Sequence, residues 1–509
     1  MGLIRSSSHY KRLFRFDSYD HQDDEFELWR DARARALLWQ MRTGKSKAMV
    51  DLACYLWCEG RIDGVFLSAP NGVHENWSLR ELPRHMWEGI GYSSLVWNSQ
   101  IVKRIYFKDR VKGFVADRSD FNLPWLMIND ETLTSKQVYA TIKRFFKGRR
   151  ILMIVDECDD FRSPGSKRTK RMRAIARYTA FTRILTGTVV SNTPLAAFSQ
   201  FELLEKGALG FDNMEDYEDH FAEYEMVTTR GGRQYPSLVK YINLDELTAS
   251  IAEWSSVVLR SDVKGLSELI PGQRVAHMTE QQQEAYNNMM DGLMDEPDMD
   301  EDEIEPFTGG AKLTKLQQIV SGFLIGRDGV VRDLCPEGNP RIQALIDQIN
   351  EEDGKIIIWC RFKEDIRQVA AALRALGRNV VEYHGSISKK QKLKNLQAFQ
   401  EDPTVTDLVG QPQAGGRGRD MSAANQMIWY SHTFDLILRE QASERATKVG
   451  KGAVAVTDIR VPGTVDDYTL ENLEEKRSIS DDVAGRGLQA VLEDLRQRWL
   501  SVTQEGSTK

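Results

Sequence analysis

Gly44-Lys45-Ser46 is the group of residues in this sequence with the most evident chemistry. It lies between an apolar run, 36–39, and a segment with helical spacing, which is typical of a phosphate-binding loop. In such a loop the backbone N–H groups and the helix dipole attract an anion. Lys45 would reach the β- and γ-phosphates and Ser46 would hold Mg²⁺. The strict pattern also has a Gly five residues before Gly44, where this chain has Trp39.

The acidic pair Asp156-Glu157 directly follows the apolar run 151–155. In a chain with a phosphate loop, such a carboxylate can hold Mg²⁺ through water. Its neighbour can polarise the water that attacks a γ-phosphate. The alternative interpretation is a solvated acidic loop.

Polar residues end two further apolar runs. Asn129 follows 125–128, and Thr186-Gly187-Thr188 follows 184–185. Ligands of open α/β sheets bind outside the carboxyl ends of the strands, so these residues are candidates for the same edge.

Apolar runs and helical patterns alternate in two series, which predicts parallel sheets covered by helices. The first series comprises strands at 36–39, 65–67, 125–128, 151–155 and 184–185, with a helix at 45–59. The second comprises strands at 356–359, 380–381, 427–429 and 453–456, with helices at 363–376 and 389–399. We therefore expect an α/β protein with two lobes and a connector.

Composition excludes several classes of protein. The 509 residues are 41% hydrophobic and 28% charged, as in ordinary globular proteins. No apolar run reaches the roughly 20 residues that a membrane span needs, and no secretion signal is evident. The five cysteines lack the paired spacing of a zinc site, which favours a reducing cytoplasm. The net charge of −7 gives no global sign of nucleic-acid binding.

Local charge is more informative. Two basic clusters, 143–150 and 162–173, could bind phosphates or could be solvated helix faces. The acidic run 295–305 is expected to be a flexible loop. An Asp-Gly pair predicts a hairpin at 323–331, and the spacing of 487–500 predicts an amphipathic helix packed on a lobe.

In their order, these segments resemble the motifs of helicase superfamily 2, and within it the Swi/Snf-type DNA-translocating ATPases in a compact, phage-like form. The resembling segments of the first lobe are the Q motif (19–22), motif I (40–46), motif Ia (67–77), NDETL (129–133), motif II (156–159) and motif III (185–204). Those of the second lobe are motif IV (356–362), EYHGS (382–386), motif V (413–421) and motif VI (441–451).

The resemblance implies two RecA-like parallel-sheet lobes of a P-loop NTPase, with ATP and Mg²⁺ as cofactors. The implied boundaries are an N-terminal arm (1–13), lobe 1 (14–210), a helical insertion and linker (211–340), lobe 2 (341–475) and a C-terminal helical tail (476–509). It also implies a cytoplasmic monomer, in a bacterial or phage-infected cell, that acts on duplex or branched DNA during replication, recombination or repair.

Specific roles follow for individual residues. ATP would be bound by Gln22, Thr43, Gly44, Lys45, Ser46, Gly416 and Gly418. Catalysis would involve Lys45, Asp156, Glu157, Arg445 and Lys448, with Ser46 and Asp156 holding Mg²⁺. Thr186, Gly187, Thr188 and Gln441 would couple the nucleotide state to DNA. DNA would contact Pro70, Asn71, Asn129, Lys167, Arg168, Lys170, Arg171, His384 and Gly385.

Two residues depart from the family pattern. Lys448 stands where the family usually has an arginine finger, and a Lys cannot offer a forked guanidinium contact. Arg417, Arg419 or Arg439 could compensate. Arg42 replaces the usual Gly of motif I.

Three functions remain open from the sequence. The first is a double-stranded DNA translocase. The second is a strand-separating or branch-migrating helicase, for which the 323–331 hairpin is a candidate wedge. The third is a nucleotide-gated DNA-binding scaffold with little hydrolysis, which the Lys448 departure motivates.

Overall fold

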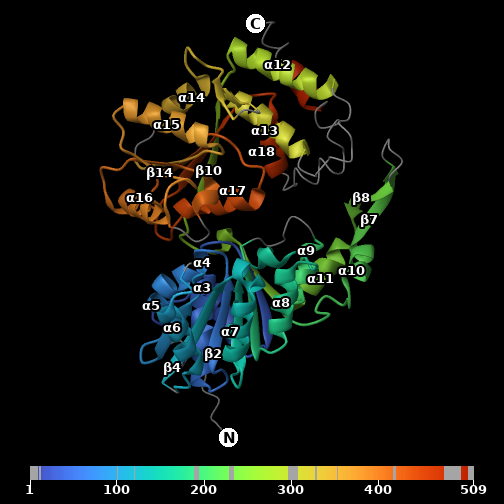
Figure 1. The fold of residues 1–509 in the computed structure, drawn as a ribbon, viewed down its shortest axis with the longest axis vertical. Coiled ribbons are helices and arrows are strands. Elements are labelled where there is room, and N and C mark those ends of the chain that lie inside the picture. Colours follow the sequence, from blue (N-terminus) through green and yellow to red (C-terminus); the bar gives the residue numbers. More distant parts are fainter. Residues whose placement is uncertain are drawn as a thin grey trace. The chain divides into compact units, whose positions relative to one another are not determined.

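The computed structural model describes residues 10, 13–99, 101–119, 121–187, 194–228, 234–295, 308–326, 329–351, 354–415, 420–474 and 494–501. These residues form two compact units, each built on its own sheet (Figure 1). The first unit contains Met1–Glu223 and Lys240–Lys264. The second contains Tyr224–Val239, Gly265–Gly415 and Arg419–Lys509. Among the described residues no helix is both long and apolar enough to cross a membrane.

The first unit contains a seven-stranded sheet of order β3-β4-β2-β5-β6-β1-β9, in which every described pairing is parallel. The strands are β1 (Ala34–Trp39), β2 (Gly64–Ala69), β3 (Gly91–Val96), β4 (Asn122–Asn129), β5 (Ile151–Asp156), β6 (Phe181–Thr186) and β9 (Ser255–Val258). The main helices are α2 (Asp20–Trp29), α3 (Lys45–Cys58), α6 (Ile105–Ala116), α7 (Lys136–Phe146), α8 (Lys167–Ala176), α9 (Ala196–Phe201), α10 (Met214–Phe221) and α11 (Leu244–Trp254). Because all strands run the same way, their carboxyl ends share one edge.

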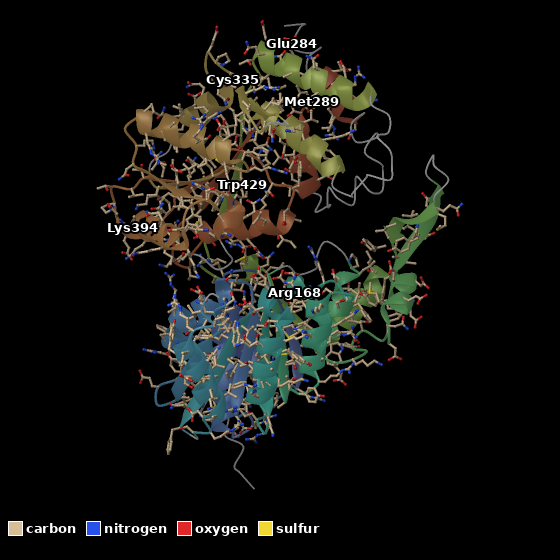
Figure 2. The ribbon with its side chains drawn as sticks, in the orientation of Figure 1. Arg168, Glu284, Met289, Cys335, Lys394 and Trp429 are labelled. Carbon is tan, nitrogen blue, oxygen red and sulfur yellow. The ribbon has the colours of Figure 1, made fainter. Side chains whose placement is uncertain are left out.

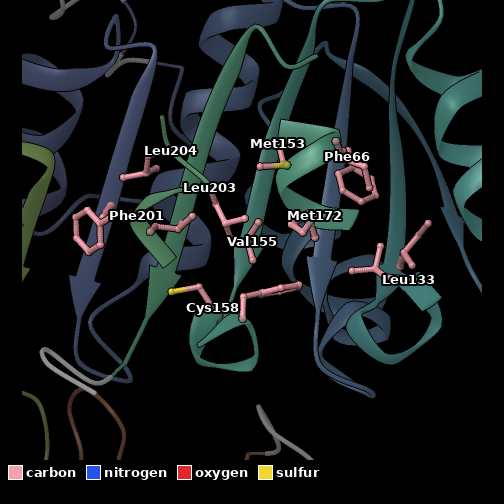
Figure 3. Close-up of a cluster of buried hydrophobic side chains, with 14 of the residues drawn as sticks. Phe66, Leu133, Met153, Val155, Cys158, Met172, Phe201, Leu203 and Leu204 are labelled. Atoms are coloured by element: carbon pink, nitrogen blue, oxygen red, sulfur yellow. The ribbon is translucent and has the colours of Figure 1, made fainter. Parts of the chain in front are cut away.

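Buried strands explain the continuous apolar runs in the sequence. All six residues of β5 are buried, as expected for a strand covered on both faces. Figure 3 shows Phe66, Met153 and Val155 of this core together with Met172 of α8. The steps β3 to β4, β4 to β5 and β5 to β6 all move in the same direction along the sheet. Right-handed crossovers therefore place α6, α7 and α8 on one face.

The second unit contains a six-stranded sheet of order β10-β17-β16-β13-β15-β14, again with parallel pairings. The strands are β10 (Leu269–Val275), β13 (Ile356–Trp359), β14 (Val380–Tyr383), β15 (Asp407–Gly410), β16 (Gln426–Trp429) and β17 (Val454–Arg460). Its helices are α12 (Glu280–Asp295), α13 (Thr308–Val320), α14 (Pro340–Asn350), α15 (Lys363–Ala375), α16 (Lys389–Glu401), α17 (Leu436–Ser443) and α18 (Val465–Glu474).

The prediction of two parallel-sheet lobes is confirmed, and each strand expected from the sequence is present. Strands β3, β9, β10 and β15 were not predicted. Of these, β9 and β10 lie in the segment expected to be a helical insertion, yet β9 pairs with β1 and β10 with β17. The same segment contains a two-stranded sheet of β7 (Ala222–Thr228) and β8 (Gln234–Tyr241).

Two smaller expectations are also met in the second unit. Strands β11 (Phe323–Ile325) and β12 (Val331–Asp333) form the predicted hairpin. In the predicted tail helix, residues 494–501 are helical, and Trp499 donates from Nε1 to Asn287 of α12 at 2.7 Å. The acidic run lies outside the described residues except for Asp295, the last residue of α12.

Candidate functional site

The phosphate loop joins β1 to α3 and is shaped by Gly44, whose φ of 89° is left-handed. A Cβ at Gly44 would lie 2.1 Å from Gln22 Nε2, so only glycine fits here. Thr43 donates from Oγ1 to Gln40 O at 2.7 Å and is fully buried. Contacts within the chain therefore define the shape of the loop.

Lys45 and Ser46 begin α3, and both are half-buried. The Lys45 ammonium donates to Trp39 O at 2.7 Å. A backbone carbonyl is a weaker partner than a phosphate oxygen, so this contact is exchangeable for a charge-assisted one. Lys45 is therefore folded over the loop in which an anion would bind.

Gln22 on α2 contacts the phosphate loop directly. Its Nε2 donates to Gly44 O at 2.9 Å, and its Oε1 accepts from the backbone N–H of Tyr19 at 2.9 Å. Beside it, His21 Nε2 lies 2.8 Å from Thr43 O, and burial lowers the pKa of His21. Gln22 is only 3% exposed, so in this structure it braces the loop with both ends of its amide.

Asp156 ends β5 at the same edge of the sheet. Its Oδ2 accepts a hydrogen bond from Trp77 Nε1 at 2.9 Å, and both side chains are buried. Glu157 has a φ of 55°. This left-handed conformation is uncommon for a residue with a side chain and is often found at functional sites.

Trp77 begins a five-residue π-helix, η1 (Trp77–Glu81), between α4 (Val73–Asn76) and α5 (Leu82–His85). Glu81 ends this turn, and burial raises the pKa of its carboxyl group. The negative charge of Asp156 also raises this pKa, whereas the positive charges of Arg84 and Arg42 partly oppose the increase. Glu81 therefore lies within the electrostatic reach of both the loop and Asp156. The sequence contained Trp77 within a recognised motif but gave no reason to assign it or Glu81 a role.

Thr186 at the end of β6 donates from Oγ1 to Asp159 Oδ2 at 2.7 Å, and Gln200 Nε2 donates to Asp159 Oδ1 at 3.2 Å. A Cβ at Gly187 would lie 3.7 Å from Lys45 Nζ. The structure thus brings residues of motifs I, II and III into one cluster. Thr188 lies outside the described residues.

Arg42 has a φ of 68°, in the left-handed region that favours glycine. This conformation explains why the family usually has a Gly at this position, because Gly adopts a left-handed backbone without strain. In this chain an Arg adopts the same strained backbone.

The candidate residues of the second unit differ in exposure. Arg445, in η7 (Glu444–Ala446), is 3% exposed, with its guanidinium 5.4 Å from the centre of the Trp359 ring. Gln441 on α17 is also buried, whereas Lys448 is exposed. Nη2 of Arg439 donates to both carboxylate oxygens of Asp458, at 2.6 and 2.7 Å, so in this structure Arg439 is engaged within the second unit. Gly416, Arg417, Gly418 and Arg419 lie outside the described residues.

The predicted DNA contacts occupy the strand ends of both sheets. Pro70 and Asn71 follow β2, Asn129 ends β4, and His384-Gly385 follows β14. Asn71 and Gly385 are exposed, whereas Pro70 and Asn129 are buried. His384 lies half-buried with Nε2 3.1 Å from Glu382 Oε2.

The basic residues of α8 have different surroundings. Lys167 and Lys170 are exposed. Arg168, labelled in Figure 2, lies 3.9 Å from Asp160. Arg171 donates to Leu133 O at 2.5 Å, and its neighbour Arg173 pairs with Glu202. Internal contacts therefore engage part of this cluster, and its lysines remain available to a ligand.

The two parallel sheets form RecA-like lobes, and the first of them contains the phosphate loop. Residues 340–450 match the family described as the helicase conserved C-terminal domain. The chain is 26% identical over 179 residues to the TATA-binding protein-associated factor MOT1 of Saccharomyces cerevisiae, over 34% of this chain and 9% of that protein. It is 21% identical over 454 residues to the Zorya protein ZorD of Escherichia coli, over 83% of this chain and 41% of that protein.

The solved structures that resemble this chain include the Sulfolobus solfataricus SWI2/SNF2 ATPase core in complex with dsDNA. The identity is 18%, the TM-score is 0.40, and the match covers 96% of this chain and 97% of that one. The domain match and the partial similarity to MOT1 agree with the resemblance to Swi/Snf-type ATPases of helicase superfamily 2 that the order of the motifs indicates. The chain matches only 9% and 41% of the lengths of the two relatives above.

Proposed function

We propose that this chain is a DNA-dependent ATPase that translocates along double-stranded DNA. The observation that carries the proposal is the cluster at the carboxyl edge of the first sheet. There Lys45 lies beside Gly187, and Thr186 is hydrogen-bonded to Asp159 of motif II. These contacts link the phosphate loop to the segment expected to respond to DNA.

The donor set fits ATP with Mg²⁺. A half-buried ammonium and hydroxyl begin α3. Two buried carboxylates lie at the same edge of the sheet: Asp156 ends β5, and Glu157 directly follows it. Lys45 would bind phosphate oxygens, and Ser46 and Asp156 would hold Mg²⁺, which supplies charge neutralisation on the phosphates. Glu157 would accept a proton from the attacking water.

Gln22 would contact adenine, as the motif resemblance implies. Its amide has two N–H donors and an oxygen with two lone pairs, so it can make this contact in addition to its hydrogen bonds with Gly44 and Tyr19. Arg445 and Lys448 would sense the γ-phosphate as the lobes close, and Gly416 and Gly418 would complete that contact. These roles rest on the motifs. Closure driven by ATP and release on hydrolysis would then move the protein along the phosphate backbone.

DNA is proposed as the partner because exposed Lys167 and Lys170 follow motif II at the same edge of the sheet. Asn71 and Gly385 are also exposed at strand ends. Contacts of this kind engage the backbone rather than base edges, which suits movement along any sequence.

The test is the ATPase rate of the parent, Lys45→Ala and Glu157→Gln proteins, measured without nucleic acid and with duplex DNA, single-stranded DNA, forked DNA or RNA. We expect stimulation by duplex DNA in the parent and loss of turnover in both variants. Lys206→Ala, which removes a lysine from a surface ion pair with Asp212, is the matched control. Unchanged rates in Lys45→Ala and Glu157→Gln would refute the assignment.

A strand-separating helicase is the second candidate function. The hairpin of β11 and β12 favours it, since Val330 and Val331 are 54% and 43% exposed and could separate bases. Unwinding of a forked duplex that is lost in a Val330→Asp/Val331→Asp variant would support this function. Triplex displacement without unwinding would support translocation alone.

A further inference from the structure

Helices α7 and α8 are unusually basic for a chain with a net charge of −7. They contain Lys136, Lys143, Arg144, Lys167, Arg168, Lys170, Arg171 and Arg173, and neither helix contains an Asp or a Glu. The rest of the chain must therefore be more acidic than the net charge indicates. This concentration of one sign on two helices needs a physical explanation.

The two helices present this charge on one face of the first sheet. Tyr139 of α7 lies between cations of both helices, with Lys143 Nζ 4.7 Å and Arg171 Cζ 5.4 Å from its ring centre. Arg118, just beyond α6, donates to Lys147 O at 2.8 Å, so the basic surface continues past the end of α7.

We name the exposed part of this surface the basic face. It consists of Lys136, Lys143, Arg144, Lys147, Lys167 and Lys170.

Helix stability explains only part of the basic face: Lys143 and Arg144 lie in the last turn of α7, where the dipole favours cations. Lys136, Lys167 and Lys170 lie in the first turns of their helices, where the dipole disfavours cations, and neither first turn contains an acidic residue. Within the described residues, no ion pair involves any of the six side chains. Six mutually repelling cations are therefore retained without a counter-charge from the protein.

The basic face extends away from the nucleotide-binding edge. Helix α7 begins beyond the carboxyl end of β4 and ends before the amino end of β5. Eleven residues separate Lys136 from Lys147 in the sequence, which corresponds to about 16 Å along a helix. Lys143, Arg144 and Lys147 therefore lie toward the opposite edge of the sheet from Lys45 and Asp156.

We infer that the part of the basic face far from the nucleotide-binding edge, Lys143, Arg144 and Lys147, binds the phosphate backbone of a second duplex DNA segment, distinct from the segment engaged at the carboxyl edge. A row of exposed cations matches the regular phosphates of a duplex, which carries about one charge per 1.7 Å. This inference shares with the proposed function only the assumption that DNA is a partner.

The test is a sandwich capture assay with the full chain. One duplex is fixed to a bead, protein is added, and a second, fluorescent duplex is captured through the protein. The parent is expected to capture the second duplex. Lys143→Gln/Arg144→Gln/Lys147→Gln is expected to lose capture while its DNA-stimulated ATPase is unchanged.

The matched control is Lys206→Gln/Lys240→Gln/Lys264→Gln, which removes the same charge from surface residues near Asp212, Glu223 and Asp20. The control should capture like the parent. In the basic-face variant, the slope of log K against log salt for the second duplex should fall by up to about 2.7, at about 0.9 per phosphate contact.

Capture that survives in the basic-face variant, or is lost equally in the control, would overturn the inference. Absence of capture by a parent that still shows DNA-stimulated ATPase would overturn it without affecting the proposed function. Capture by a protein that lacks ATPase activity would refute the proposed function and leave this inference standing.

Discussion

The hydrogen bond from Trp77 to Asp156 gives the sharpest prediction about the nucleotide site. The donor and acceptor are 2.9 Å apart, and the two side chains are 1% and 7% exposed. Trp77→Phe keeps an aromatic ring against Trp125, whose ring centre lies 6.2 Å away, but removes the donor. The Oδ2 atom of a carboxylate proposed to hold Mg²⁺ through water would then lose this hydrogen bond.

The magnitude follows from two losses. A hydrogen bond to a charged group contributes about 1.5–3 kcal/mol, and the smaller ring leaves a cavity that costs about 1 kcal/mol more. A domain of this size changes in melting temperature by about 2–4 °C per kcal/mol, so we expect a decrease of about 5–15 °C. Because partners of metal ligands orient those ligands, Mg²⁺-dependent nucleotide binding should weaken by about 10- to 100-fold.

The assay titrates Mg²⁺ against binding of a fluorescent ATP analogue and records thermal unfolding separately. Trp125→Phe is the matched control: Trp125 is fully buried in the same core, and its Nε1 has no hydrogen-bond partner among the described residues. The control should lose some stability and keep the parent's Mg²⁺ dependence. Equal Mg²⁺ dependence in Trp77→Phe and Trp125→Phe would refute the positioning role of Trp77.

Three further predictions concern the phosphate loop, motif VI and the second unit. Arg42→Gly should raise the free energy of unfolding by about 0.5–1 kcal/mol. The left-handed backbone costs an Arg about 1–2 kcal/mol, which exceeds the entropic cost of placing a Gly there. A denaturant titration measures the change, and lower stability in the variant would contradict this prediction. Lys448→Arg should raise DNA-stimulated kcat about tenfold, because a guanidinium contacts a phosphate bidentately, and an unchanged rate would show that Lys448 does not limit turnover. Burial raises the pKa of Asp365 from 3.8 to about 6, so its protonated form is favoured in the folded state. Stability from this group is therefore greatest below pH 4 and falls by about 3 kcal/mol as the pH rises to 6, at 1.36 kcal/mol per unit over 2.2 units. Asp365→Asn should lack this decrease when pH-dependent unfolding curves of the two proteins are subtracted, and identical curves would contradict the assignment.

The central strands and the site motifs were readable because their signals are local. A strand such as β5 is buried on both faces, so its apolar run is continuous and ends abruptly at Asp156. The phosphate loop is likewise defined within a few residues. Edge strands gave weaker signals: β3, of sequence GYSSLV, has mostly half-buried residues and no continuous apolar run.

The sequence by itself determined the alternation of strands and helices, the order of the motifs and the residue types available for chemistry. Only the tertiary structure decided which of those residues meet. Trp77 and Asp156 are 79 positions apart, and Arg439 is paired with Asp458 by the folding of the second unit. The charge clusters were visible as composition, but whether Arg171 or Lys170 is available to a ligand depends on carbonyls and rings from other elements. Local periodicity is a property of neighbours in the chain, whereas hydrogen-bond partners and burial are properties of neighbours in space.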